Sequence, residues 1–434
     1  MGFLNRIVAV EDNEIRPMLW AGICYFILFA AYFILRPIRD EASVAGGVRN
    51  LQWLFLATLL GMLLIHPLYA ALVSRLPRSR FIHIIYSFVA LSLIAFWFLF
   101  RDLTEAQGIW VGRAFSVWVS IFNLFVVSIF WSLMADLFRP SQARRLFGFV
   151  AVGGTLGAVV GSSTTAFLAS RMTPTDLLLV SAALLALAMM AARQLALSAP
   201  RIEGQNSTGT DPGEQPVGGG LIDGIRLAFS SPYLLGIVGY MLLYTITATF
   251  LYFQQAEIVE ASFTDRGART VFFARIDVAV NSLTALIQIF FTGRIVRRLG
   301  IALALAALPL LCVLGFAAVG LAPTLTSIAV FQILRRTSNY AIARPCREML
   351  YTVLPRDAKY KAKNFIDTFV YRLGDQVGAW SYAALGAVGL GAVAASAIAA
   401  PLAVVWLGIG VWLGQRQKAL ADSSESSILA PNSH

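Results

Sequence analysis

Charged residues, histidine, cysteine and lysine are all scarce in this chain of 434 residues. Only 13% of the residues are charged, whereas a soluble domain carries about 25%. Because 58% of the residues are apolar and the mean hydropathy is +0.73, no folded arrangement could give the chain a fully polar surface. This composition excludes a cytosolic enzyme, a secreted module and a disordered regulator. It predicts an integral membrane protein.

The rare residue types exclude further classes of protein. The three cysteines are isolated in the sequence and one of the three histidines is the last residue, so neither a disulfide framework nor a zinc cluster is expected. None of the four lysines lies in the G-x-x-x-x-G-K-[ST] pattern of a P-loop. We therefore expect no enzyme activity, no catalytic residue, no cofactor and no metal site. Transport work would draw on a solute gradient or on exchange.

Twelve apolar runs are long enough to cross a membrane, since a helical span takes about 20 mainly apolar residues. One long polar stretch, residues 198–222, is rich in glycine and proline and contains serine and aspartate, and it predicts a flexible linker. The sequence predicts an all-α membrane protein with six-helix bundles in 1–197 and 223–434, the second followed by a short tail. The expected spans are 17–37, 51–74, 81–100, 108–138, 147–170, 175–197, 233–254, 271–293, 300–321, 323–346, 364–388 and 391–415.

Arginine and lysine between the runs predict the orientation in the membrane. With both termini inside, the inner segments hold nineteen of these residues and the outer segments seven, which favours cytoplasmic termini and a cytoplasmic linker. The acidic residues before the first run do not resemble a cleavable signal peptide. We expect a monomer in a bacterial inner membrane, in contact with the lipid bilayer and not with nucleic acid.

The two halves also resemble each other. The loop YAALVSRLPRSR follows the second run and FFTGRIVRRLG follows the eighth, and each approximates the major facilitator signature G-x-x-x-D-R-x-G-R-R. The signature aspartate is absent from both, where Ser74 and Arg297 stand. Together with two sets of six spans, these loops resemble the major facilitator architecture of two related bundles.

Ionisable groups within spans are costly in lipid and therefore mark functional candidates. Four polar stripes follow helical spacing in spans that line the cavity of the facilitator architecture. They contain more arginine than acid, which favours an anionic solute because arginine binds carboxylate and phosphate through two parallel hydrogen bonds. The alternative is structural pairing, for example of Arg113 or Arg275 with a carboxylate. The stripes are Tyr25, Tyr32, Arg36 and Arg39; Arg113, Ser116, Ser120 and Asn123; Asp277, Asn281, Thr284 and Gln288; and Arg336, Tyr340, Arg344 and Arg347.

Glycines at positions 153, 157 and 161 give two consecutive G-x-x-x-G spacings in the fifth run. This spacing indicates close packing of two helices in a membrane. A role in gating is a second interpretation.

Specific strings resemble the ATP/ADP antiporter family of nucleotide transporters. The segment VEDNEIRPMLW…YFILRPIRDEASV is similar to the opening of that family, with Arg39 where the family has a functional lysine. FWSLMADLF at 130–138 resembles the family's F-W-G-x-A-N-E. The string FQQAEIVEAS places Glu257 at a position that resembles the family's acidic substrate-site residue.

The strongest match is residues 344–378, which resemble the family's P-x-K-E-M…K-x-K-A-x-I-D…R-x-G-K-x-x-G. Three of the four lysines lie in this segment, where a compact ammonium group suits phosphate. The chain departs from the family in having no acid in 114–124 and Asp375 where the family has lysine. A relative that moves another phosphorylated or anionic solute therefore stays open beside ATP/ADP exchange.

We predict an alternating-access secondary transporter of an anionic, phosphorylated solute, with nucleotide exchange as one form. Proton-coupled transport of another organic anion, with Asp277 or Glu257 as proton carrier, is the alternative. A membrane enzyme or a non-transporting sensor has the least support, because no nucleophile–base pair or metal cluster is visible. The candidate substrate-binding residues are Arg36, Arg39, Asp40, Arg113, Glu257, Asp277, Asn281, Arg344, Arg347 and Lys363.

Overall fold

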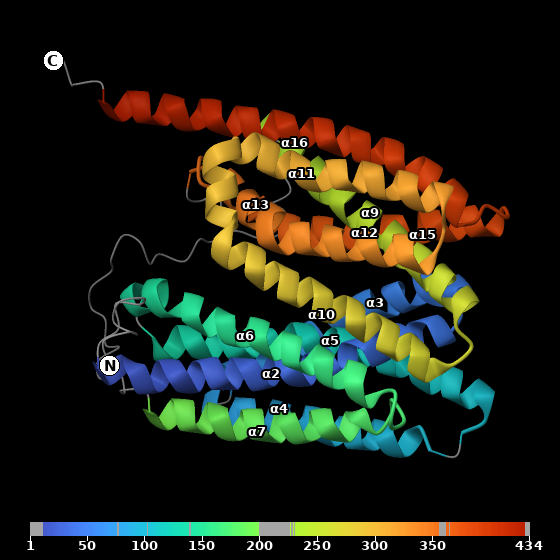
Figure 1. The fold of residues 1–434 in the computed structure, drawn as a ribbon. Helices are drawn as coiled ribbons and strands as arrows, with labels where there is room; N and C mark the ends of the chain where they lie inside the picture. The colour runs from blue at the N-terminus through green and yellow to red at the C-terminus, as the bar shows by residue number, and fades with distance from the viewer. Residues whose placement is uncertain are drawn as a thin grey trace. The chain divides into compact units, whose positions relative to one another are not determined.

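The computed structural model describes most of the chain, and every regular element in the described residues is helical. The predicted linker except for Ser198, as well as Lys359 and Lys361, lies outside the described residues. Figure 1 shows the helices and their labels. The described residues are 12–75, 78–101, 103–138, 140–198, 226, 229, 231–355, 362–363 and 365–429.

The chain divides into two compact units whose border does not follow the sequence halves. Unit 1 comprises residues 1–208 together with 263–281, and unit 2 comprises 209–262 together with 282–434. The helix α10 (Arg266–Phe290) therefore contributes its first sixteen residues, 266–281, to unit 1. This division places residues from the second half of the sequence beside those of the first. The predicted domain borders stay a prediction.

Unit 1 is built around its first helix. The helix α2 contacts α5, α6 and α7, and α4 lies against α7. Leu35 of α2, Phe115 of α5 and Leu185 of α7 are fully buried in the core. The elements of this unit, besides the start of α10, are α2 (Asp12–Ala45), η1 (Val48–Asn50), α3 (Leu51–Arg75), α4 (Arg78–Leu99), α5 (Glu105–Leu137), α6 (Pro140–Leu168) and α7 (Leu177–Ser198).

Glycines of α6 set its distance from α2. A Cβ atom added at Gly153 would lie 2.5 Å from the carbonyl oxygen of Gly22. Cβ atoms at Gly157 and Gly161 would clash with the carbonyl oxygens of Phe26 and Ala30. Only glycine lets the two backbones approach this closely. The predicted packing role of this spacing is confirmed.

In unit 2, α9 lies between two packing partners. It contacts α15 and α16, and α16 also packs along α11. The fully buried Trp406 of α16 contacts the ring of Tyr240 of α9, with ring centroids 5.3 Å apart. Besides the end of α10, the elements are α9 (Pro232–Ser262), α11 (Thr292–Leu321), α12 (Leu325–Ser338), η2 (Asn339–Ala343), α13 (Arg344–Leu350), η3 (Ile366–Val370), α15 (Tyr371–Ala387) and α16 (Ala392–Leu429).

Nine helices in the described part of the chain are long and apolar enough to cross a membrane. They overlap nine of the predicted spans. The predicted span 81–100 corresponds to the shorter apolar helix His83–Leu99. The predicted spans 323–346 and 364–388 coincide with α12 and α15, which carry charges and are each joined to a π-helical turn. The total of twelve stays a prediction.

Candidate functional site

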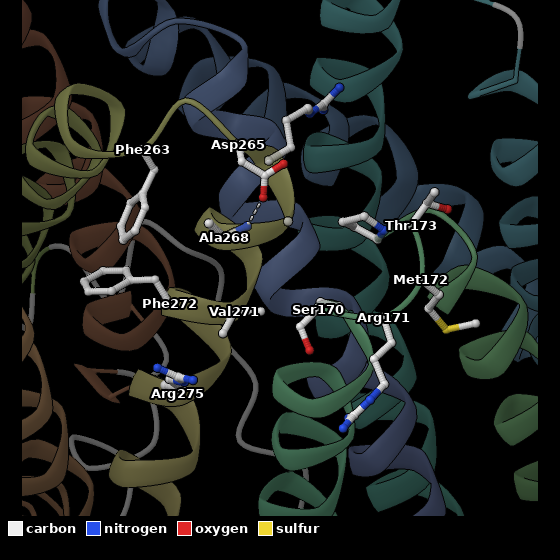
Figure 2. A pocket seen from close by; sticks show the side chains of 14 residues that line it. Ser170, Arg171, Met172, Thr173, Phe263, Asp265, Ala268, Val271, Phe272 and Arg275 are labelled. Atoms are coloured by element: carbon white, nitrogen blue, oxygen red, sulfur yellow. Dashed lines mark hydrogen bonds between the residues drawn. The ribbon is translucent and has the colours of Figure 1, made fainter.

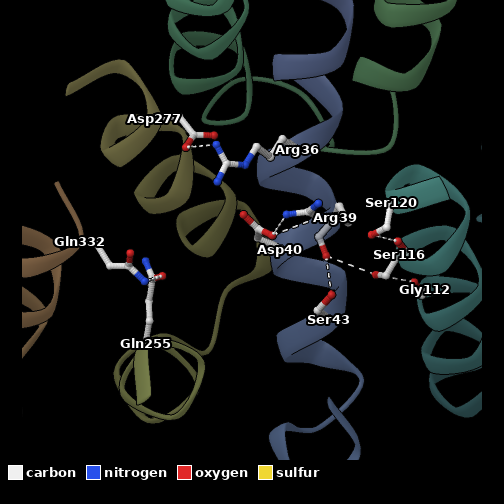
Figure 3. A network of polar contacts seen from close by, with 10 residues as sticks. All are labelled: Arg36, Arg39, Asp40, Ser43, Gly112, Ser116, Ser120, Gln255, Asp277 and Gln332. Carbon is white, nitrogen blue, oxygen red and sulfur yellow. Dashed lines mark hydrogen bonds and ion pairs between the residues drawn. The ribbon is translucent and has the colours of Figure 1, made fainter. Parts of the chain in front are cut away.

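A buried ion pair joins α2 and α10 in unit 1. Nη1 of Arg36 lies 3.1 Å from Oδ1 of Asp277, and the Asp277 side chain is only 2% exposed. Figure 3 shows the two side chains pointing toward each other from their separate helices. A lone charge at such a place would be costly in a membrane, so each group needs the other or a substitute ligand. Two predicted site residues are thereby brought together.

Arg39 and Asp40 form a second pair on α2. The Nη2 and Nε atoms of Arg39 donate to Oδ1 of Asp40 at 2.6 and 3.1 Å. The backbone carbonyl of Arg39 accepts hydrogen bonds from Ser43 at 2.9 Å and from Ser116 of α5 at 3.2 Å (Figure 3). These contacts fix the second pair close to the first on the same helix.

A third ion pair was not predicted from the sequence. Nε and Nη2 of Arg266 donate to the two carboxylate oxygens of Glu41 at 2.9 and 3.2 Å, and the Glu41 side chain is 3% exposed. Such a two-point contact is the strongest geometry for arginine and a carboxylate. Together with Arg36 and Asp277, it connects α2 and α10 twice within unit 1.

Arg113 has a different environment. Its Nη2 donates to the carbonyl of Gly46 at 2.6 Å, just after α2 ends, and its guanidinium lies 4.7 Å from the ring centroid of Trp110. Ser116 and Ser120 donate to carbonyls of their own helix. Arg113 therefore links the end of α2 to α5 through a backbone carbonyl, and not through the carboxylate that the structural alternative expected.

The polar stripe on α10 contains unsatisfied groups. Asn281 and Thr284 are buried, yet Nδ2 of Asn281 and Oγ1 of Thr284 have no hydrogen-bond partner among the described residues. Buried polar atoms in native proteins nearly always have a partner, so these two are positioned for water or for a bound polar molecule. They follow Asp277 at helical spacing, four and seven residues later.

In unit 2, Glu257 of α9 accepts a hydrogen bond from the hydroxyl of Tyr382 at 2.9 Å. Two residues earlier, Gln255 accepts one from Nε2 of Gln332 of α12 at 2.8 Å (Figure 3). Gln254 donates to Ser396 of α16, also at 2.8 Å. The string that resembles the nucleotide transporters therefore contains three polar residues that connect α9 to three neighbouring helices.

A cluster of cations surrounds Tyr244 of α9. The guanidinium groups of Arg335 and Arg347 lie 5.3 and 4.7 Å from the centroid of its ring. Arg335 also donates to the Tyr244 carbonyl at 3.4 Å, and its Nε has no hydrogen-bond partner among the described residues. Because the Arg335 side chain is buried, this cation depends on the aromatic ring for much of its stabilisation.

The remaining predicted cations lie on either side of residues 356–361, which are outside the described part of the chain. Arg344 and Arg347 are on α13, where Arg344 is exposed. Lys363 forms an ion pair with Glu348, and its Nζ lies 5.8 Å from the ring centroid of Tyr351. Asp375, which stands where the nucleotide transporters have lysine, pairs instead with Arg372 at 3.3 Å.

Two π-helical turns flank these cations. One comprises Asn339–Ala343, directly before Arg344, and the other Ile366–Val370, three residues after Lys363. Single π turns within α-helices are rare and frequently mark functional sites, because the extra residue rotates the side chains that follow. One turn directly precedes residues 344–378 and the other lies within them, and this is the segment that most resembles the nucleotide transporters.

A family model of the Major Facilitator Superfamily matches residues 20–346. This chain belongs to that superfamily. The transporter is also similar to ADP,ATP carrier protein 1 of Chlamydia trachomatis, with 19% identity, and of Chlamydia muridarum, with 21% identity. Each match covers 96% of the transporter and 92% of its relative. The resemblance inferred from the sequence motifs is confirmed.

Solved structures of other transporters share its fold. A bacterial homolog of the human lysosomal transporter Spinster, inward-facing and unoccupied, has 15% identity and a TM-score of 0.55, with 95% of the transporter and 98% of that chain covered. The nucleoside transporter NupG has 12% identity and a TM-score of 0.56, over 94% and 99%. A POT family transporter in complex with 5-aminolevulinic acid has 10% identity and a TM-score of 0.61, over 92% and 96%. The chain is a multi-pass membrane transporter.

Sequence reasoning missed several polar residues of the transporter. Arg335 is buried, whereas the predicted stripe used its neighbour Arg336. Glu41 and Arg266 lie between the predicted spans and outside the four polar stripes. The sequence contains a signal for Glu41, because this residue directly follows Arg39 and Asp40. Tyr25, which was included, packs in the core against Phe130 and Trp131.

Proposed function

We propose that this protein is an alternating-access secondary transporter of an organic anion that carries phosphate or carboxylate groups. The observation that carries the proposal is the buried pair of Arg36 and Asp277, next to the unsatisfied Nδ2 of Asn281. We further propose that it lies in a bacterial inner membrane with both termini in the cytoplasm, as the positive residues favour.

The pair supports exchange of one anion for another. A phosphate or carboxylate oxygen of the solute has the same charge and geometry as the Asp277 carboxylate, so it competes for the Arg36 guanidinium. Leaving either partner of a buried pair alone costs about 3–5 kcal/mol, which makes the empty site favour the paired state. Solute binding then releases α10 from α2, and separation of Glu41 from Arg266 follows.

Unit 2 offers a second set of anion ligands. Arg347 and Lys363 lie beside the aromatic rings of Tyr244 and Tyr351, and both belong to the segment most similar to the nucleotide transporters. Lysine and arginine together fit a polyphosphate better than they fit a single carboxylate. The compact ammonium group of lysine and the planar guanidinium of arginine can bind different phosphate oxygens. We propose Arg39, Asp40, Arg344 and Glu257 as further contributors.

The finer proposal is nucleotide exchange of the ATP/ADP type. It is supported by the similarity to two ADP,ATP carrier proteins and by the motif at 344–378. Proteoliposomes loaded with ADP should take up labelled ATP, while empty proteoliposomes should not. Uptake no greater than that of protein-free vesicles, across a panel of nucleotides, would refute the nucleotide substrate. Exchange of sugar phosphates or dicarboxylates in the same assay would leave the broader anion proposal standing.

Proton-coupled transport is the second candidate. It is favoured by Glu257, whose hydrogen bond comes from the neutral hydroxyl of Tyr382 and which has no cation paired with it among the described residues. A protonophore should then reduce uptake in the presence of a pH gradient, and Glu257→Gln should remove this sensitivity. Uptake that the protonophore does not change would argue for anion exchange.

A further inference from the structure

One end of unit 1 contains a pocket of about 820 Å³ formed by two segments far apart in sequence. One segment, residues 169–174, follows the end of α6, and the other runs from Phe263 into α10 as far as Arg275. Figure 2 shows Phe263, Phe272 and Arg275 on the left of the view and Arg171 to Thr173 on the right. We call it the α6–α10 pocket. None of the proposed transport ligands lines it.

The charges of the α6–α10 pocket leave an excess of positive charge. Its lining includes three arginines and one aspartate. Arg266 is neutralised by Glu41, and Oδ2 of Asp265 accepts a hydrogen bond of 2.6 Å from the backbone N–H of Ala268, which caps the start of α10 (Figure 2). The remaining two cations are Arg171 and Arg275.

These two cations have no carboxylate partner among the described residues. Arg171 donates to the carbonyl of Phe167 at 3.1 Å and lies 3.6 Å from the centroid of its ring. The exposed side chain of Arg275 has no hydrogen bond or ion pair within the part of the chain that the structure describes. A guanidinium within a membrane helix without an anion is costly. We therefore expect Arg275 to bind an anion from outside the chain.

The lining of the pocket combines arginine with apolar side chains, which indicates the kind of anion that would fit. The pocket lies where α6 ends and α10 begins, and Arg275 follows Arg266 by nine residues, or about 14 Å along the helix. The pocket wall also includes Val271, Phe272 and Met172, which suit acyl chains better than a free inorganic ion.

We propose that the α6–α10 pocket binds an anionic phospholipid, with its phosphate held by Arg275 and Arg171. Free phosphate is the other source of the same chemistry, and the apolar wall favours the lipid. This site would be separate from the residues that we propose bind the transported solute. Its occupancy would fill the space between the start of α10 and the segment after α6.

The test measures thermal unfolding of the purified full chain in nonionic detergent with one of three additions. Dioleoyl phosphatidylglycerol should raise the unfolding temperature, whereas dioleoyl phosphatidylcholine and inorganic phosphate should have much smaller effects. In Arg275→Gln the apparent affinity for phosphatidylglycerol should fall about tenfold, since a charge-assisted contact is lost. Arg275→Lys should retain much of it.

Arg294→Gln is the matched control, because Arg294 is an exposed helical arginine that does not line the pocket. It should behave as the parent does. If Arg275→Gln does not fold, Arg171→Gln replaces it in the same comparison. Equal stabilisation by phosphatidylcholine, or an unchanged affinity in the Arg275 or Arg171 variant, overturns the proposal. Equal stabilisation by inorganic phosphate would contradict the phospholipid proposal and indicate a site for free phosphate.

Discussion

At the scale of single residues, Arg36 and Asp277 raise the question of whether a buried pair serves stability or binding. Their distance of 3.1 Å is compatible with both roles. The two roles differ in what happens when both charges are removed together. A structural pair can be replaced by neutral groups at little cost, whereas a binding cation cannot.

A double-mutant cycle on this pair separates the roles. Arg36→Gln and Asp277→Asn should each lower stability by about 3–5 kcal/mol, and the double variant should recover most of that loss. Unfolding in detergent measures the stability, and uptake by proteoliposomes measures transport. We expect the double variant to remain inactive. Parent-like uptake by a stable double variant would assign the pair to structure alone.

Asp176 provides a pH-dependent prediction, because it directly precedes α7 and so lies outside the helix that is long enough to cross a membrane. Hydrogen bonds from Thr173 at 2.5 Å and from Trp97 at 3.0 Å lower the pKa of Asp176 below its usual value. The stabilisation is therefore present above the unfolded-state pKa of about 3.9 and is lost as the pH falls through the folded-state pKa. Because the Asp176 side chain is only half-buried and water screens its charge, the effect should stay below about 1 kcal/mol.

Thermal unfolding between neutral and acidic pH checks this prediction. Asp176→Asn should flatten the loss of stability at low pH, and the exposed Glu105→Gln should not. An acid profile of Asp176→Asn that coincides with the parent's would contradict the assignment.

At the scale of helices, the prediction from sequence succeeded where apolar runs were long and failed where charges interrupt them. The first span was predicted to end at 37, but α2 continues to Ala45. It can do so because Arg39 pairs with Asp40, and Glu41 pairs with Arg266. Charge alone therefore marks a helix end poorly, since the partner that neutralises it can lie far along the chain.

The same limit applies to the candidate site. Arg36 and Asp277 were both predicted from their polar stripes, but their pairing depends on packing between segments that the sequence does not place. The π-helical turns at Asn339–Ala343 and Ile366–Val370 have no sequence signal of their own. Glycine spacing was informative because a Cβ clash is a local and short-range constraint.

The packing of α6 on α2 can be tested with one pair of variants. Gly157→Leu should destabilise unit 1 by about 1–3 kcal/mol or more, because its side chain would clash with the carbonyl of Phe26. A Cβ atom added at Gly148 on the same helix meets nothing within 4 Å, so Gly148→Leu should change stability by less than about 0.5 kcal/mol. Fluorescence-detected size exclusion and thermal unfolding measure both variants. Equal tolerance at the two positions would show that the backbones do not approach this closely.

At the scale of the whole molecule, membership of the superfamily and the arginine-rich polar stripes lead to one central claim. Facilitators share a fold but carry many kinds of solute, so the fold alone does not give the substrate. We propose that the charged groups of the site determine the class of solute. Two neighbouring arginines on α2 and a second group of cations in unit 2 favour an anion over a neutral or cationic solute.

The most direct test compares a labelled anion with its uncharged counterpart in the same proteoliposomes. ATP with adenosine, and glucose 6-phosphate with glucose, differ chiefly in their phosphate groups. The account predicts uptake of at least one anion, no uptake of its neutral counterpart, and loss of anion uptake in the stable Arg36→Gln/Asp277→Asn variant. Uptake of the neutral molecule alone, or anion uptake that the double variant retains in full, would contradict it.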